Sequence, residues 1–594
     1  GSPRLSRIFF DRRDPSQYFF TDPYDFCVQR PEDVIFTNTF SPFTNLSYYK
    51  GGGSRDGEER FKSYFAINAN KRLGFGFYID YLYGRGLYQD QSTAFFNGGL
   101  FSSYRGDKYD MHFIFNNDNL KMAENGGITD DRYITNPLDM AEGKKEYSAN
   151  EIPTRLSQIW NHNTSYHAFL THRYNLGFYK EKQDSVDTDS VKITQVFVPV
   201  TSFIHTLQVD LNNRKYISYD DAQNQKYFEH NYLGTDSIDK TKRTSIKNTI
   251  GIALQEGFNK WAKAGLTAFL SYEYRNFALT DTTNIPGQRI INNYKESSLS
   301  IGGELSKKQG KLLHYNILGE LAIAGEDAGQ FSVEGRGDLN LRLFGDTVRL
   351  DVNAFIKNQN PVFYFRHFQS KHYWWDNNDL SKIMRTRLEG KLSLDRWGTQ
   401  LRAGVENIKN YTYLANASIP VKDSEGNVTG FKNNAAVRQH SGNIQIFTAM
   451  LQQKLKVGIF HLDGEVAYQK SSEQDILPLP ELSAYGNLYM KFGLAKKVLQ
   501  IEMGADVRYF SKYYAPDYSP VIGQFYNQNP DDKIEIGAFP IVNVYANLHL
   551  KRTRFFIMMY HVNAGSGKSN YFLAPHYPIN PRMIKFGLSW NFFD

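Results

Sequence analysis

Alternation of apolar and polar side chains with a period of two recurs from end to end of the chain. The stretches Leu73–Tyr83, Leu266–Arg275 and Val542–Leu550 each place apolar side chains on one face and polar or small ones on the other. Successive side chains of a β-strand point to opposite faces, so each stretch is typical of a strand with one face in an apolar environment and the other in water. No run approaches the roughly 18 apolar residues of a transmembrane helix. The pattern therefore predicts an all-β chain.

The connections between these strands fall into two kinds. One kind is tight and polar, as at Arg105–Asp107 and Lys551–Arg554, and the other is long. The long connections are Lys121–His162, Tyr219–Arg243, Asn358–Leu380, Tyr411–Asn434, Ser511–Asp532 and Gly565–Asn580. Counted back from the C-terminus, short and long connections largely alternate, which is typical of outer-membrane barrels with short periplasmic turns and long extracellular loops.

Composition favours the same class. The chain has 44 Phe, 40 Tyr and 6 Trp, yet its mean hydropathy is −0.52. Barrel strands that alternate between lipid and lumen combine many aromatics with low mean hydropathy. A soluble multi-sheet protein is the alternative, but it does not explain aromatics at strand ends. We expect one antiparallel up-and-down transmembrane barrel of about 22 strands from near Thr44 to Phe593, with 18 or 20 strands left open.

This interpretation divides the chain into an N-terminal periplasmic or lumen segment, residues 1–42, and a barrel, residues 43–594. The opening residues contain no signal peptide, so we expect Gly1 to follow a removed leader. Cys27 is the single cysteine, so no internal disulfide forms. The net charge of +7 is modest, and no long basic run indicates nucleic acid as a partner. Catalytic and metal-ligand signatures are scarce, and we expect no enzyme, no metal and no cofactor.

One hairpin carries a row of charge on a single face. A charged row of this kind must meet water, because a basic side chain on the lipid face near the midplane costs about 2–4 kcal/mol. The row either lines a solvated lumen and filters solutes, or forms a cross-strand salt-bridge ladder that stiffens the wall, and interleaved signs favour the ladder. The candidate lumen-lining residues are Glu334, Arg336, Asp338, Arg342, Arg349 and Asp351.

The connection Phe363–Asn378 is crowded with aromatic side chains, among them Tyr373, Trp374 and Trp375. These three could form an exposed platform for sugar or a partner protein, although an aromatic girdle at the membrane interface is the favoured interpretation. The acidic stretches Asp184–Asp189 and Asp376–Asp379 could bind Ca²⁺, but neither has full EF-type spacing, and solvated loop charge is favoured.

Several stretches resemble the putative porins of Bacteroidota. They are Ser41–Gly53, Ile67–Ser92, Ser102–Phe113, Glu124–Ile134, Val196–Leu207, the motif "HYWWDNN" at His372–Asn378, and Phe539–Asp594. The resemblance implies a barrel in the outer membrane of a Gram-negative bacterium that is presumed to be a channel. It carries no active-site residue to this chain, and fold alone does not establish function.

The last strand resembles the C-terminal insertion signal of outer-membrane barrels. Lys585, Gly587, Trp590 and Phe592 fill the polar, glycine and aromatic positions, although the chain ends two residues later than that signal. We expect the apolar face of this strand to meet lipid. We expect the strand itself to pair with the first strand near Thr44–Tyr49, which leaves the sheet without a free edge.

Two functions of different class follow. The first is a porin-like channel for passive or weakly selective passage of small hydrophilic solutes, and its Trp374 loop could make it sugar-specific. An open lumen of this width would compromise the membrane, so we expect obstruction by Lys121–His162, by the N-terminal segment or by a partner. The alternative is an accessory barrel of a larger envelope complex for secretion, assembly or lipoprotein display. Outer-membrane lipid is an expected partner in both, and other outer-membrane proteins or lipoproteins in the second.

Overall fold

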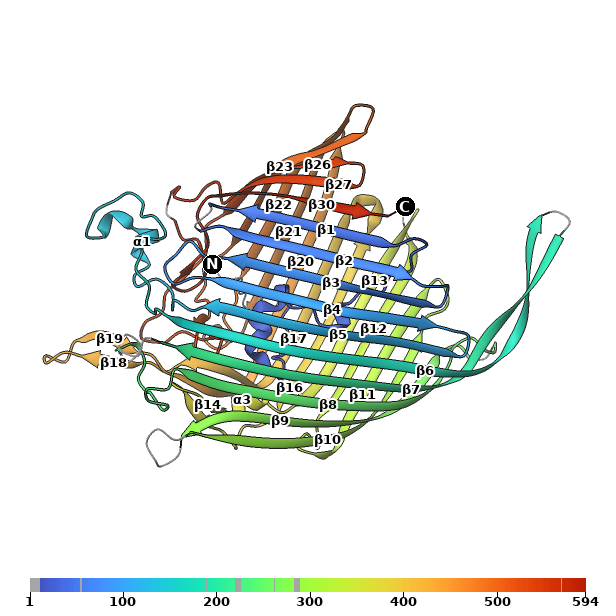
Figure 1. Cartoon of the computed structure of the whole chain (residues 1–594), viewed down its shortest axis with the longest axis horizontal. Coiled ribbons are helices and arrows are strands. Elements are labelled where there is room, and N and C mark those ends of the chain that lie inside the picture. Colours follow the sequence, from blue (N-terminus) through green and yellow to red (C-terminus); the bar gives the residue numbers. More distant parts are fainter. Residues whose placement is uncertain are drawn as a thin grey trace.

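The computed structural model describes residues 11–53, 56–187, 190–219, 226–260, 262–282, 289–343, 345–567 and 569–593. Side chains at 182–194, 343, 346 and 347 lie outside this description. Twenty-two strands of the described chain form one antiparallel sheet, and the first strand pairs with the last, so the sheet is closed (Figure 1). The predicted barrel of 22 strands is confirmed.

The barrel strands follow one another in chain order around the wall. They are β1 (Phe43–Gly51), β2 (Glu58–Asn68), β3 (Leu73–Gly84), β4 (Thr93–Arg105), β5 (Tyr109–Ala123), β6 (Ile159–Asp187), β7 (Ser190–Ser218), β8 (Ile238–Leu254), β9 (Gly265–Thr282), β10 (Arg289–Lys307), β11 (Leu313–Gly325), β12 (Phe331–Leu343), β13 (Asp346–Gln359), β16 (Ile383–Leu394), β17 (Thr399–Asn416), β20 (Ala435–Val457), β21 (Phe460–Ser471), β22 (Leu482–Leu494), β23 (Leu499–Phe510), β26 (Ile541–Leu550), β27 (Thr553–Tyr560) and β30 (Met583–Phe592).

The shorter elements lie in the connections and in the N-terminal segment. They are η1 (Phe19–Cys27), η2 (Pro31–Asp33), α1 (Arg132–Thr135), η3 (Pro137–Asp139), α3 (Phe363–Arg366), β14 (His367–Gln369), β15 (Trp374–Asp376), η4 (Asp395–Trp397), β18 (Ile419–Lys422), β19 (Val428–Lys432), β24 (Asp517–Ser519), β25 (Gln524–Tyr526), β28 (Phe572–Ala574) and β29 (Tyr577–Pro578). In the described residues, no helix is long and apolar enough to cross a membrane.

The seam between β1 and β30 closes the barrel in the expected register. Thr44 pairs with Phe592 and Gly51 with Lys585. The side chains of Ile584, Phe586 and Trp590 are about half exposed on the outer face, whereas Lys585 forms an ion pair with Glu58. The apolar stripe of the last strand therefore faces outward, as predicted.

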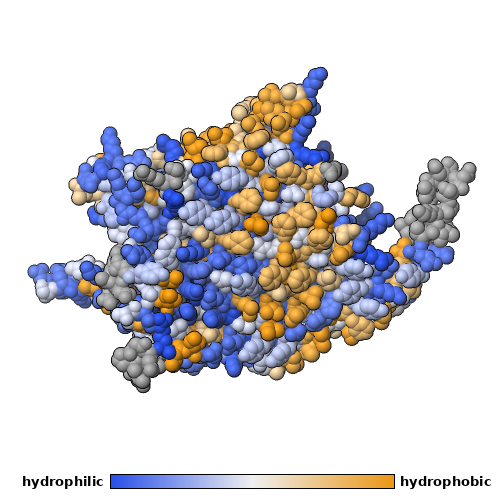
Figure 2. Space-filling model, in the orientation of Figure 1, coloured by the Kyte–Doolittle hydropathy of each residue, from blue (hydrophilic) through white to orange (hydrophobic). Residues whose placement is uncertain are grey.

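The two ends of the barrel differ. The long connections, with α1, α3 and the β18–β19 hairpin, gather at one end, which we call the loop end (Figure 1). The short turns lie at the opposite end, the turn end, with the β6–β7 hairpin reaching beyond it. Hydrophobic side chains form a band on the outer surface, and the loop end is mostly hydrophilic (Figure 2). This division is typical of a barrel whose loops stand clear of the bilayer.

The β6–β7 hairpin extends past its neighbours at the turn end. Pairing of β5 with β6 ends at Tyr109 and Tyr174, and pairing of β7 with β8 begins at Thr201 and Leu254. From the pair of Gly177 with Pro199 outward, the described backbone of β6 pairs only with that of β7, as far as the pair of Asp187 with Ser190. At about 3.3 Å per residue, the projection is about 40 Å long.

Residues 11–42 form an arch inside the barrel. The ascending limb lies on β16 and β17, where Arg12 forms an ion pair with Glu406. Helix η1 crosses beneath the loop end, and the hydroxyl groups of Tyr24 and Tyr518 lie 2.7 Å apart. The descending limb follows β2–β5, where the side-chain amide of Asn116 donates to the carbonyl of Gln29. The arch thus spans the lumen between two parts of the wall; its division from the barrel as a separate domain stays a prediction.

Candidate functional site in the barrel lumen

An apolar cluster, which we call the gate cluster, lies at the loop end of the lumen. Its members come from the arch, from opposing parts of the wall and from four long connections that fold inward. They are Tyr18, Phe19, Phe20, Leu156, Ile159, Tyr216, Phe228, Phe277, Leu279, Val362–Phe365, Phe368, Tyr373, Trp375, Leu414, Ala435, Val521, Ile522 and Tyr526. Because the cluster joins β7 and β9 to β17 and β20, it crosses the lumen.

Aromatic packing holds the arch within this cluster. The ring of Phe19 stacks on Tyr364 at a centroid distance of 5.2 Å, and Phe20 meets Tyr364 edge-on at 4.6 Å. Phe277 of β9 stacks on Phe363 at 3.9 Å. Pairs of this geometry contribute about 0.5–1.5 kcal/mol beyond their buried area. The cluster is consequently a packed apolar layer.

Arg214 of β7 ties the wall to the connection above the gate cluster. Its guanidinium, 1% exposed, donates to the carbonyls of Pro520 and Val521 and to the side-chain oxygen of Asn161. The same group lies 4.7 Å from the ring centroid of Phe20. A buried charge requires such partners, because its desolvation is costly. Arg214 therefore couples wall, connection and arch.

The aromatic stretch of the long connection is largely buried, which corrects both sequence-based interpretations. Tyr373 is fully buried and donates to Asn433, and Trp375 is 7% exposed and donates to the carbonyl of Tyr364. These two rings are neither an exposed platform nor a membrane girdle, because the connection folds into the lumen. Only Trp374, at 49% exposure, remains accessible, and it lines a surface cavity of about 290 Å³.

The structure describes side chains for only one of the two acidic stretches that were considered as Ca²⁺ sites, Asp376–Asp379. A carboxylate oxygen of Asp376 lies 2.6 Å from Nδ1 of His367 across the β14–β15 pair. The side chains of Asp184–Asp189 lie outside the described residues. Within the part of the chain that the structure describes, no three His, Cys, Asp or Glu side chains converge as metal ligands would.

The charged hairpin faces the lumen, but its ladder has different members from those predicted. Of the six candidates, only Arg349 and Asp351 pair with each other in the described structure, at 3.5 Å. The remaining ion pairs reach outside the set: Lys357 for Glu334, His314 for Asp338 and Lys391 for Asp351. Arg336 has no ion-pair partner among the described residues and is exposed to the lumen. His314 and Lys391 lie on the neighbouring strands β11 and β16, so no pattern within the hairpin predicts these two pairs.

Basic side chains outnumber acidic ones on this part of the wall. The registers of β12, β13, β16 and β17 place them on one face, which is the face that the arch contacts. The basic members are Arg336, Arg342, Arg349, Lys357, Arg385, Arg387, Lys391 and Arg402; the acidic members are Glu334, Asp338, Asp351, Glu389 and Glu406. Eight cations thus face five anions.

The residues Asp11–Asp14, which we call the latch, complete this charge pattern. Asp11 accepts from Arg402 at 2.8 Å, and Arg12 donates to Glu406 at 3.0 Å. Asp14 pairs with Arg385 and lies 3.8 Å from Lys357. Ion pairs between guanidinium and carboxylate are directional as well as strong. The latch fixes the ascending limb in one register on the wall; sequence analysis missed it because no motif marks such pairs.

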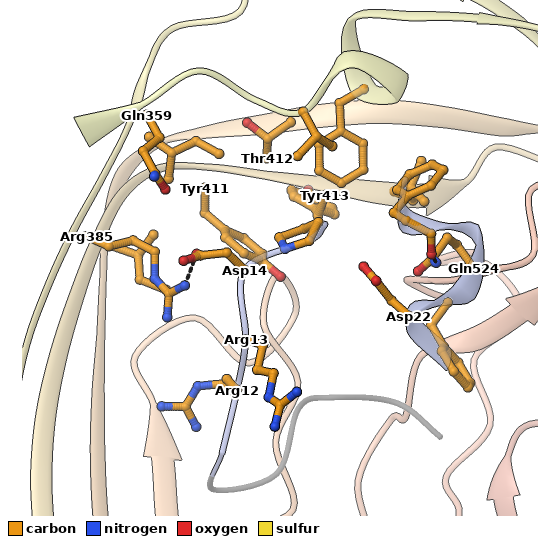
Figure 3. A pocket seen from close by; sticks show the side chains of 18 of the residues that line it. Arg12, Arg13, Asp14, Asp22, Gln359, Arg385, Tyr411, Thr412, Tyr413 and Gln524 are labelled. Atoms are coloured by element: carbon orange, nitrogen blue, oxygen red, sulfur yellow. Dashed lines mark hydrogen bonds and ion pairs between the residues drawn. The ribbon is translucent and has the colours of Figure 1, made fainter. Parts of the chain in front are cut away.

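A cavity of about 450 Å³ lies between the arch and the wall (Figure 3). Arg12, Arg13 and Asp14 enter it from the latch, Arg385 from β16, and Tyr411 and Tyr413 from β17. The two tyrosine rings stack at 5.8 Å. The cavity therefore combines charged and aromatic surface beside the gate cluster.

Burial changes the acidity of two groups in the arch. Burial raises the pKa of Asp22 to about 6, although Ser16 donates two hydrogen bonds to its carboxylate. Burial likewise raises the pKa of the Cys27 thiol to about 11. A thiol with a raised pKa reacts slowly, because the thiolate is the nucleophile. Because Cys27 is also buried in the docked arch, its rate of labelling by a thiol reagent should rise when the arch undocks.

Fold and lumen together define a transmembrane β-barrel of the Gram-negative outer membrane, with an N-terminal segment and loops inside its lumen. The whole chain, residues 1–594, matches the model of the family described as "Putative porin", and the chain belongs to that family. No curated protein matches the sequence significantly.

Solved structures resemble this fold at low sequence identity. The siderophore receptor PirA from Acinetobacter baumannii has a TM-score of 0.61 and 10% identity, over 94% of this chain and 81% of that chain. A mutant of the ferric enterobactin receptor PfeA from Pseudomonas aeruginosa gives 0.60 and 12%, over 93% and 80%. The copper transporter OprC gives 0.57 and 9%, over 93% and 80%. At such identities the likeness shows the fold alone.

Proposed function

We propose that this protein is an outer-membrane channel for small hydrophilic solutes, and that the described conformation is its closed state. The observation that carries the proposal is the contrast within the lumen: a charged wall with cavities lies beside an apolar cluster that crosses the loop end. A wall of ion pairs suits a solvated pathway, whereas a packed apolar layer excludes water and ions. The proposal assigns no catalytic step.

The fold relatives agree with transport as the general role, since they are a siderophore receptor, a ferric enterobactin receptor and a copper transporter. Passive or weakly selective passage is proposed from the family and the wall. No residue is carried over from those relatives.

Planar-bilayer recording tests the channel. The full chain should insert and conduct rarely, because the gate cluster is packed. The double variant Phe20→Ala with Tyr364→Ala removes two rings that meet at 4.6 Å, and it should conduct more often and at larger amplitude. Phe586→Ala on the outer face is the matched control and should behave as the parent chain. Confirmed insertion with no current from the gate variant would contradict the proposal.

An accessory role in a larger envelope complex is the second candidate. It is favoured by the β6–β7 hairpin, whose base exposes Leu176, Phe178 and Tyr179 beyond the turn end. Copurification from native membranes separates the two functions. A stoichiometric partner together with a silent gate variant supports the accessory role, and a conductive barrel that purifies alone argues against it.

A further inference from the structure

A second cavity marks the charged wall. It has a volume of about 300 Å³ and is lined by Glu334, Arg336, Asn353, Arg387, Glu389 and Arg402, among others. Its two carboxylates are engaged: Lys357 holds Glu334 at 2.7 Å, and Arg387 and Arg402 hold Glu389 at 2.5 and 2.6 Å. Arg336 has no ion-pair partner in the described chain. A guanidinium without a carboxylate partner in a walled cavity is suited to an anionic group.

The latch, which is not part of the sheet, places two carboxylate side chains against the same wall. Asp11 contacts Arg402 at 2.8 Å, and Asp14 contacts Arg385 and Lys357. All three cations belong to β13, β16 and β17, and Arg402 also lines the second cavity. Asp11 and Asp14, which are not part of the sheet, thus pair with cationic side chains of the lumen wall.

We propose that the channel selects small anionic solutes with carboxylate or phosphate groups. In this proposal, the carboxylates of Asp11 and Asp14 compete with the solute for the same cationic side chains of the wall. The inference rests on the proposed channel and adds its substrate class and its regulation. An incoming anion exchanges with the latch carboxylates, and the arch loses its hold on β16 and β17. The excess of basic side chains on this wall then faces the solute.

Neutralising the latch carboxylates tests the exchange. In the variant Asp11→Asn with Asp14→Asn, the arch should undock more often, and maleimide labelling of Cys27 should accelerate about threefold to tenfold. Glu32→Gln is the matched control, because Glu32 lies in the same segment, is exposed and has no wall partner in the described structure. Its labelling rate should equal that of the parent chain.

Reversal potentials in a KCl gradient test the substrate class. The latch variant should favour chloride over potassium, and Arg336→Gln added to it should reduce that preference. Succinate and inorganic phosphate, tested separately, should reduce the chloride current, and glycerol should not. A response to only one of the two anions would assign the solute to that class.

The outcomes separate the inference from the proposed channel. A conductive latch variant without chloride preference would overturn the anion inference and leave the channel standing. Unchanged Cys27 labelling would overturn the competitor role. Silence of both the latch and the gate variants, with accelerated labelling and confirmed insertion, would overturn the channel and with it the inference.

Discussion

At the residue scale, the buried carboxyl of Asp22 makes docking of the arch sensitive to pH. Its pKa is about 6 in the docked arch, against an ordinary value of 3.8, because burial disfavours the charged form. The docked arch therefore binds this proton more tightly than the undocked arch does. The contribution of Asp22 favours docking at low pH and is lost as the pH rises from about 4 to about 6.

Asp22→Asn should remove this pH dependence, since the amide oxygen can still accept from Ser16. Relative to the parent chain, Cys27 of the variant should label more slowly at pH 8, and this difference should shrink as the pH falls toward about 4. Taking the ratio of the two rates at each pH cancels the pH dependence of the maleimide reaction and of the unchanged latch carboxylates. A ratio that is constant across this range would contradict the assignment.

At the element scale, Gly587 allows β30 to close against β1. A Cβ atom at this position would lie 2.3 Å from the carbonyl oxygen of Tyr48 and 2.8 Å from the ring of Phe556. Gly587→Ala should therefore lower the fraction of chain that folds into lipid vesicles, as followed by heat-dependent gel mobility. Gly390→Ala is the control, because a Cβ atom there would meet nothing within 4 Å and folding should be unaffected.

This experiment also separates packing from targeting. Folding into vesicles needs no assembly machinery, so a loss there assigns the effect to the seam. Normal folding in vesicles together with failed assembly in cells would instead support Lys585, Gly587, Trp590 and Phe592 as an insertion signal. The signal itself stays a prediction.

The elements differ in how far sequence predicts them. The alternation in β3, β9 and β26 predicts strands because each of these strands places apolar side chains toward lipid and polar ones toward the lumen, so its own sequence shows the pattern. The burial of Tyr373 and the pairing of Asp11 with Arg402 depend on segments far apart in the chain. The periodicity of a short stretch of sequence does not indicate contacts between distant segments. The one available signal was Tyr18–Phe20, a run of aromatics outside any strand that had to be buried somewhere.

At the scale of the whole molecule, the wall and the β6–β7 hairpin are structurally independent beyond the turn end. Replacing residues 177–199 by an Asn-Gly turn should leave the unfolding temperature of the barrel unchanged, because the removed pairs connect β6 only to β7. Shortening the β12–β13 hairpin by eight pairs is the contrasting control and should destabilise the barrel, because the removed residues include Arg336–Leu339, which pair with β11, and Val348–Asn353, which pair with β16. Heat-dependent gel mobility measures both.

The seam between β1 and β30 closes the ring around the arch. The arch is joined directly to the first strand of that ring. Its contacts with β5, β7 and β17 bridge parts of the wall that lie far apart around the ring. Once the ring is closed, the arch remains attached through Phe43, so its release leaves it tethered at the turn end of the same barrel.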